Sequence, residues 1–286
     1  MKEPMVKVAI LDLYDNEPNQ GMRCILDIVQ SWDRKIRDIP VVYHVHETRH
    51  MAEVPGLDYD IYISSGGPGS PFDGVGKRWE KRYFELIDQI WNHNRRQAGR
   101  PKHVFFICHS FQMMCRFFEM ATVQQRDQRS FGILPVRKTH AANSDLMMKA
   151  LPEIFYAADF RQFEAVDPNI ARFAELDATI LSKEKFRRNP LLELALMAIR
   201  VSDEMVGTQF HPEADPVSML YHFRQPERKQ QVLSEYGEER YYEMIEHLED
   251  PANILLTRRN ILPNFLKNAI EKIYPEAALA DVMKAG

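Results

Sequence analysis

Short apolar runs alternate with segments of helical period through the first third of this chain, and this alternation limits its fold more than any other feature. Apolar side chains recur at spacings of three and four within residues 22–32 and again within 77–94, as in amphipathic helices. Strand–helix alternation with short apolar strands favours a parallel sheet covered on both faces. We therefore predict an α/β three-layer sandwich with a mostly parallel central sheet. The predicted strands are 6–13, 40–45, 59–64 and 103–107.

The remainder of the chain divides into a strand-rich stretch and a charged tail. Strand patterns occur at 133–136, 178–182, 194–200 and 205–209, punctuated by Pro, Asn and Asp. From about residue 225 the period becomes helical, and a last helix is predicted over 263–274. We expect a main domain over residues 1–224 and a helical C-terminal extension over 225–286.

Composition and charge narrow the class of protein. The 286 residues are 45% apolar and 27% charged, with a formal net charge of −4, which gives no electrostatic footprint for nucleic acid or a membrane surface. No run approaches the roughly 18 apolar residues of a spanning helix, and residues 1–7 contain no secretory apolar region. Cys24, Cys108 and Cys115 form neither a disulfide framework nor a metal-like pair. We expect a cytoplasmic protein that needs no metal and no cofactor and binds neither nucleic acid nor membrane.

Cys108 stands between an apolar strand and a predicted helix. Ligands of open α/β sheets gather outside the carboxyl ends of the strands. A sharp strand-to-helix turn would expose the thiol and place it at a helix N-terminus, where the partial positive charge favours the thiolate. Taken alone, such a cysteine is more often a small hydrophobic residue at a strand end.

Two further strand ends change that interpretation. Gly66 to Gly69 form a glycine-rich turn whose backbone N–H groups could stabilise an oxyanion, although glycine and proline also make plain turns. His211 and Glu213 follow a later apolar strand, and their separation by two places both side chains on one side of an extended backbone. Together these segments supply a nucleophile, a base with a group to orient it, and an oxyanion site. The sequence thus predicts nucleophilic catalysis by Cys108.

The three segments resemble the signature segments of class I glutamine amidotransferases, in order and in spacing. The residues that match are Ser65 to Ser70, Ile107–Cys108 with Gln112, and Gly207 to Glu213, while 131–136 resembles a strand of GMP-synthase-like members. The resemblance covers about residues 6–220. It implies a flavodoxin-like fold and hydrolysis of glutamine through a thioester on a cysteine, with no cofactor.

The same resemblance assigns roles to individual residues. Cys108 would attack the amide carbon, and His211, held by Glu213, would protonate the departing ammonia and then activate water. The N–H groups of Gly67 and His109 would hold the oxyanion. Gln112 would help to position the substrate. The family segment that contacts the amino-acid group of glutamine should fall near 159–163, so Arg161, Gln162 and Phe163 are the further predicted substrate-binding residues.

The sequence departs from the family in ways that keep two alternatives open. Phe106 and Ser110 stand where the family usually has glycine, and serine is tolerable at its position. Phe106 and the altered 159–163 segment motivate a second hypothesis, a non-catalytic binding protein on the same scaffold. Arg161 could grip a carboxylate with two hydrogen bonds, or lie in solvent. Homoserine O-acyltransferases of the succinyltransferase type share the Cys–His–Glu arrangement, and Asp215 and Arg224 could match residues of theirs.

The expected partners follow from the same segments. The Gly66 to Gly69 turn lacks the Gly-Lys-Ser/Thr ending of a phosphate-binding loop. Any synthetase that consumes the ammonia would then be a separate chain. The substrate would be glutamine or a related small acyl donor, and the helical extension could pair two copies into a homodimer.

Overall fold

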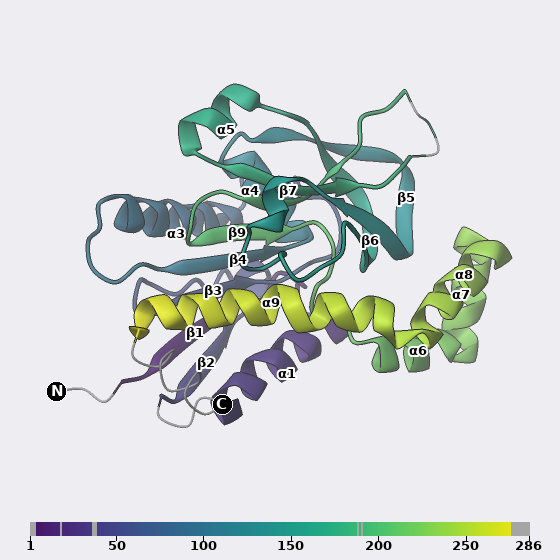
Figure 1. The fold of residues 1–286 in the computed structure, drawn as a ribbon, viewed down its shortest axis with the longest axis horizontal. Coiled ribbons are helices and arrows are strands. Elements are labelled where there is room, and N and C mark those ends of the chain that lie inside the picture. Colours follow the sequence, from purple (N-terminus) through teal and green to yellow (C-terminus); the bar gives the residue numbers. More distant parts are fainter. Residues whose placement is uncertain (1–3, 18, 36–38, 188, 190, 276–286) are drawn as a thin grey trace.

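One mixed sheet organises the protein in its computed structural model, which describes residues 4–17, 19–35, 39–187, 189 and 191–275 (Figure 1). The strand order is β2-β1-β3-β4-β9-β8-β7-β5-β6 within the described residues. The five strands from β2 to β9 pair in parallel, whereas β8, β7, β5 and β6 continue the sheet antiparallel. The predicted α/β class is confirmed. The bounds are β1 Val6–Leu11, β2 Val41–His46, β3 Ile61–Ser64, β4 His103–Ile107, β5 Ala121–Lys138, β6 Ile154–Pro168, β7 Thr179–Glu184, β8 Leu196–Arg200 and β9 Met205–Thr208.

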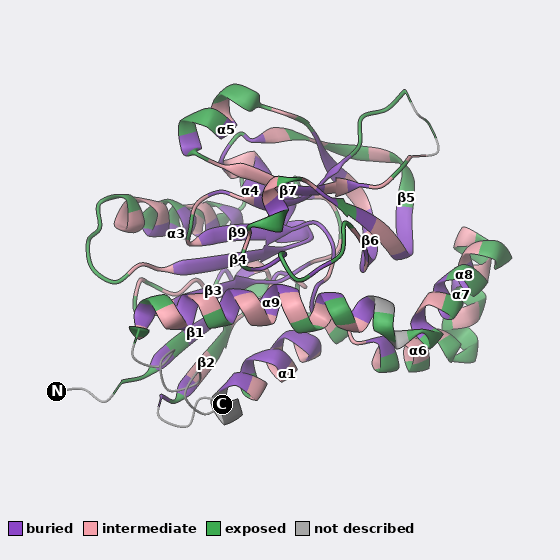
Figure 2. Cartoon of the chain, in the orientation of Figure 1, coloured by how far each residue is buried: buried purple, intermediate pink, exposed green. Residues whose placement is uncertain are grey.

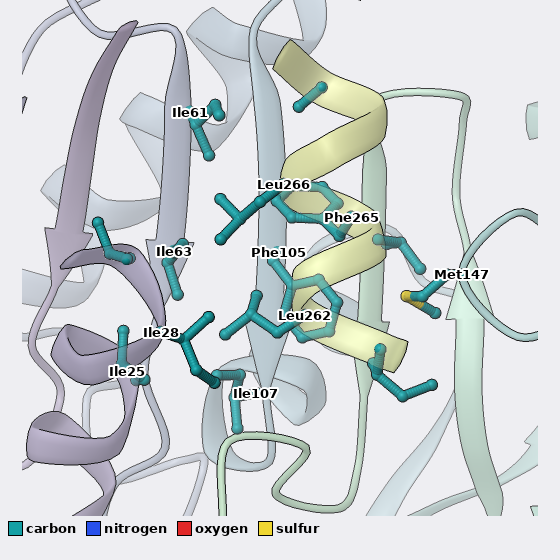
Figure 3. Close-up of a cluster of buried hydrophobic side chains, with 14 of the residues drawn as sticks. Ile25, Ile28, Ile61, Ile63, Phe105, Ile107, Met147, Leu262, Phe265 and Leu266 are labelled. Carbon is teal, nitrogen blue, oxygen red and sulfur yellow. The ribbon is translucent and has the colours of Figure 1, made fainter. Parts of the chain in front are cut away.

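Helices cover both faces of the parallel half, because successive side chains of each buried strand point to opposite faces. On β4, Phe105 and Ile107 pack toward α1 and α9, whereas Val104 and Phe106 pack toward α3 and α4. Figure 3 shows the first of these layers, where side chains of α1, β3, β4 and α9 meet. Figure 2 shows the central strands β3 and β4 as buried. The helices are α1 Gln20–Lys35, α2 Thr48–Met51, α3 Arg78–Arg95, α4 His109–Phe117, α5 Ile170–Leu176, α6 Pro216–Arg224, α7 Pro226–Tyr236, α8 Glu238–Glu249 and α9 Pro251–Ile273.

The β5–β6 hairpin is much longer than the strand predicted at 133–136. Residues 121–130 are mostly polar and partly exposed, so they carry no clear strand period. β6 contains buried charged residues, among them Asp159, Arg161 and Glu164, in a composition typical of loops. Backbone pairing between the two strands and internal ion pairs stabilise both segments. Neither signal is visible in hydrophobic periodicity.

The tail is helical, as expected, but its last helix begins earlier than predicted. A proline often occupies the first helical position, which placed the predicted start at Pro263. In the structure Pro263 lies inside α9, where it lacks the N–H that would continue the backbone ladder. α9 contributes Leu262, Phe265 and Leu266 to the core beside the sheet (Figure 3). The division at residue 224 stays a prediction, and α9 shares the core of the first part.

The other tail helices cover the end of the β5–β6 hairpin. Phe131 and Ile133 of β5 lie in one buried cluster with Met219 of α6, Val232 of α7 and Met244 of α8. α7 also lines one cavity with Gly67 and Cys108, which follow β3 and β4. Among the described residues no helix is both long enough and apolar enough to cross a membrane.

Candidate active site

Cys108 occupies a strained turn between β4 and α4. Its φ is +50° and its ψ −97°, a conformation that non-glycine residues adopt rarely and chiefly at functional sites. The turn is held by the Cys108 N–H, which donates to the Thr208 carbonyl at 2.8 Å. The side chain is 5% exposed. The structure therefore places the thiol at a helix N-terminus on a turn of the type that carries nucleophiles.

The two departures from the family glycines are accommodated around this turn. The Ser110 hydroxyl accepts from the Ile107 N–H at 2.7 Å and donates to the Ser64 carbonyl at 2.8 Å. Phe106 lies opposite Gly207 in the sheet register, and a Cβ at Gly207 would come within 3.0 Å of the Phe106 Cβ. Ser110 thus ties β4 to α4 and β3, and Gly207 leaves room for Phe106.

His211 and Glu213 form a buried pair beside the thiol. The His211 Nδ1 lies 2.7 Å from the Glu213 Oε1, and Glu213 is 1% exposed. The His211 N–H donates to the Ala158 carbonyl, which anchors this segment to β6. Arg258 of α9 donates to the Glu213 backbone carbonyl. The carboxylate is therefore fixed against one nitrogen of the imidazole.

The other neighbour of His211 is the nucleophile. Burial alone would lower the pKa of the imidazole, but the charges of Glu213 and Cys108 and hydrogen bonds to both raise that pKa well above its ordinary value. A raised imidazole pKa favours the imidazolium, which is the partner that a thiolate requires. The three predicted catalytic residues are brought together in the order nucleophile, base and orienting carboxylate.

The glycine-rich turn after β3 lies close to this group. A Cβ at Gly67 would meet the Leu13 carbonyl oxygen at 2.4 Å, and one at Gly66 would meet the His211 Cε1 at 2.8 Å. Only glycine leaves space for these contacts. Tyr14, which sequence reasoning missed, places its hydroxyl 3.0 Å from the same Gly66 position, and its pKa is raised well above the ordinary value by burial and the nearby Glu213. Tyr14 follows the carboxyl end of β1, and residues at such strand ends gather at the edge of the sheet where ligands bind. This position is the sequence signal by which Tyr14 could have been found.

The predicted oxyanion and substrate residues surround one cavity of about 320 Å³. Gln112 donates to the Phe163 carbonyl at 3.0 Å and to the Gln209 Oε1 at 3.2 Å, and the Gln209 Nε2 lies 3.7 Å from the Cys108 Sγ. Gln209 is a second residue that sequence reasoning missed. The cavity lining includes Gly67, Cys108, His109, Gln112, Arg161, Gln162 and Phe163.

His109 is buried immediately after the nucleophile. Burial, with Arg49 and Arg116 nearby, lowers the pKa of its imidazole to about 3, so the ring stays neutral at ordinary pH. Neither ring nitrogen has a partner among the described residues. The contribution predicted for His109 is its backbone N–H, which lies in the first turn of α4 and is not used in the α-helical ladder.

Arg161 is held by internal carboxylates. Its Nε lies 2.9 Å from the Asp159 Oδ1 and its Nη2 2.5 Å from the Glu184 Oε1, with the side chain 1% exposed. Within the described chain only Nη1 of this guanidinium lacks a partner. Arg161 is thus a buried member of an ion-pair network that lines the cavity, and not a solvated surface residue.

Comparison with known proteins decides the family. The class I glutamine amidotransferase model matches residues 23–222. The chain belongs to the class I glutamine amidotransferase family. No curated protein gives a significant match to the sequence. The described residues contain no group of three His, Cys, Asp or Glu side chains arranged to hold a metal ion.

Solved structures agree on the fold of this amidotransferase. A glutamine amidotransferase from Thermotoga maritima superposes with a TM-score of 0.65 at 16% identity, over 93% of this chain and 97% of that one. The glutaminase domain of Trypanosoma brucei CTPS with bound acivicin gives 0.53 at 15% identity, over 93% and 94%. A GMP synthase subunit protein from Thermoplasma acidophilum gives 0.50 at 18%, over 74% and 86%. The predicted flavodoxin-like fold is confirmed.

Proposed function

We propose that this amidotransferase hydrolyses the side-chain amide of glutamine through a thioester on Cys108. The observation that carries the proposal is the strained cysteine turn with His211 and Glu213 behind it, opening into a cavity of about 320 Å³. A cavity of this size lies at the lower end of the about 300–1,000 Å³ of small-molecule sites, which suits an amino acid.

The chemistry follows from the positions of the three side chains. The Cys108 thiolate forms a bond to the amide carbon of glutamine, and the carbonyl oxygen becomes an oxyanion near the N–H groups of Gly67 and His109. The His211 imidazolium donates its proton to the amide nitrogen, the C–N bond breaks and ammonia leaves. A water molecule then gives a proton to neutral His211 and attacks the thioester. Glutamate departs, and the thiolate–imidazolium pair is restored.

The ammonia would pass to an acceptor held by another chain. The sequence contains no phosphate-binding loop after β3, since Gly66 to Gly69 lacks the required ending. The structural neighbours include a glutaminase domain and a GMP synthase subunit protein. A separate synthetase therefore fits this site best. A homodimer formed through the helical extension and a cytoplasmic location stay part of the proposal.

Labelling by mass spectrometry tests the function. The protein is incubated with a glutamine-derived electrophile or with an acyl-CoA, and the modified residue is located. A glutamyl-type adduct on Cys108 is expected, with Cys24 and Cys115 unmodified, because burial raises the pKa of both of those thiols. Cys108→Ala should abolish labelling while the far-ultraviolet circular dichroism stays unchanged.

The other outcomes identify the alternatives. An acyl adduct on Cys108 in place of the glutamyl one would indicate the O-acyltransferase. Arg224 lies outside the cavity lining and pairs with Glu249 at the surface, and Asp215 caps α6, so neither matched residue favours that reaction. No labelling of Cys108 by either reagent would favour the binding protein.

A further inference from the structure

One wall of the cavity comes from α7, a helix beyond the stretch that matches the family model. The apolar side of α7 fixes the helix in place. Tyr236 stacks on Phe131 with 4.2 Å between the ring centroids, and Val232 is buried in the same cluster. α7 is therefore a packed wall of the pocket that holds Cys108.

The polar residues of that wall form a connected row. Arg228, Gln231 and Glu235 lie at spacings of three and four, so they share a face of the helix, and all three line the cavity. The Arg228 Nη1 donates to the Gln231 Oε1 at 2.7 Å, and the Gln231 Nε2 donates to the Glu235 Oε1 at 3.0 Å. Arg129 of β5 adds a second cation to the lining, with no ion pair among the described residues. These residues thus give this part of the cavity lining two cations, Arg129 and Arg228, and one carboxylate, Glu235.

This charge arrangement complements the head of an α-amino acid, which carries one carboxylate and one ammonium. Arg161 also lines the cavity and keeps one unpartnered nitrogen, Nη1, but its charge is already paired with Asp159 and Glu184. Arg129 and Arg228 are the lining cations with no ion pair among the described residues. We propose that α7 forms the subsite for the substrate's head group, with Glu235 binding the α-ammonium and Arg228 and Arg129 binding the α-carboxylate. The proposal rests on the function proposed above and names the residues that select the substrate.

Amides that each lack one charge of glutamine test the assignment. 4-Carbamoylbutanoate has no ammonium, and 4-aminobutanamide has no carboxylate. For each amide the KM for ammonia release is measured, together with the concentration that half-protects Cys108 from alkylation by iodoacetamide. Protection reports binding even where turnover is slow. The variants are Glu235→Gln and the double variant Arg129→Met/Arg228→Met. Glu227→Gln and Lys229→Met lie on α7 outside the lining of this cavity and serve as matched controls.

The expected pattern is selective. Glu235→Gln raises both constants for glutamine about tenfold, as for the loss of one hydrogen bond to a charged group, and leaves those for 4-carbamoylbutanoate unchanged. The double arginine variant raises the KM and the half-protecting concentration for glutamine and for 4-carbamoylbutanoate, but not for 4-aminobutanamide. Equal effects on all three amides, or no effect on glutamine, would overturn the subsite. Absence of both hydrolysis and Cys108 labelling in the unaltered protein would instead overturn the proposed function, and the subsite with it.

Discussion

Replacing Glu213 by Gln should separate the charge of the orienting group from its shape. Glutamine can still accept from the His211 Nδ1, so the ring keeps its orientation while the negative charge is lost. The carboxylate is 1% exposed and 2.7 Å from that nitrogen. A hydrogen bond to a charged group contributes about 1.5–3 kcal/mol. That range corresponds to about 10–150-fold in rate.

The sign of the pH effect follows from the causes of the pKa shift. Burial lowers the pKa of His211, and Glu213 and Cys108 hold it up. Without the Glu213 charge the imidazolium is lost at lower pH, so the alkaline limb of kcat/KM for glutamine should move toward acid. Because the folded pKa is raised, the pair stabilises the protein fully below the ordinary pKa of about 6.5, and this stability is lost as pH rises through the folded pKa.

Two measurements check this prediction. The pH profile of ammonia release is recorded for Glu213→Gln and for Glu80→Gln, a control that removes a different buried, ion-paired carboxylate. Urea unfolding of Glu213→Gln and of the unaltered protein, at acid and at alkaline pH, gives the difference in free energy of unfolding. This difference should be larger at acid pH. An unchanged alkaline limb in Glu213→Gln, or the same shift in Glu80→Gln, would refute the role of the Glu213 charge.

Three further substitutions probe the surroundings of the site. Gly207→Ala should destabilise the fold by about 1–3 kcal/mol through crowding against Phe106, as measured by thermal denaturation; an unchanged Tm would contradict the close packing. Ser110→Ala leaves the Ile107 N–H without its partner and should cost about 1–3 kcal/mol in urea unfolding, with slower alkylation of Cys108. Arg161→Met removes the cation paired with the buried Asp159, whereas Glu184 keeps its pair with Arg126, and should cost about 3–5 kcal/mol in urea unfolding; an unchanged free energy of unfolding would contradict the burial of this network.

The sequence was sufficient for the parallel half of the fold because buried strands and amphipathic helices leave strong periodic signals. β3 and β4 were predicted within two residues of their observed bounds. The nucleophile and the base were predictable for a related reason. The carboxyl ends of parallel strands meet at one edge of the sheet, so Cys108 and His211 could be placed together from the sequence.

The antiparallel half was less predictable because its stabilising interactions are long-range. Arg161 was expected at a substrate carboxylate or in solvent, and its partner Glu184 comes from another strand, 23 residues away. The pocket wall supplied by α7 depends on how Phe131 and Tyr236 pack, which no local period encodes. Tertiary contacts of this kind determine which side of a helix faces a cavity.

Direct detection of the intermediate tests the central proposal most simply. The protein is mixed with glutamine, quenched in acid within the first turnover, and digested for mass spectrometry. We predict a glutamyl group in thioester linkage on the peptide that contains Cys108, absent in Cys108→Ser and reduced in His211→Gln, which lacks the imidazolium that protonates the departing ammonia. Ammonia release at an unchanged rate by Cys108→Ser, or a glutamyl group on Cys24 or Cys115, would contradict the account.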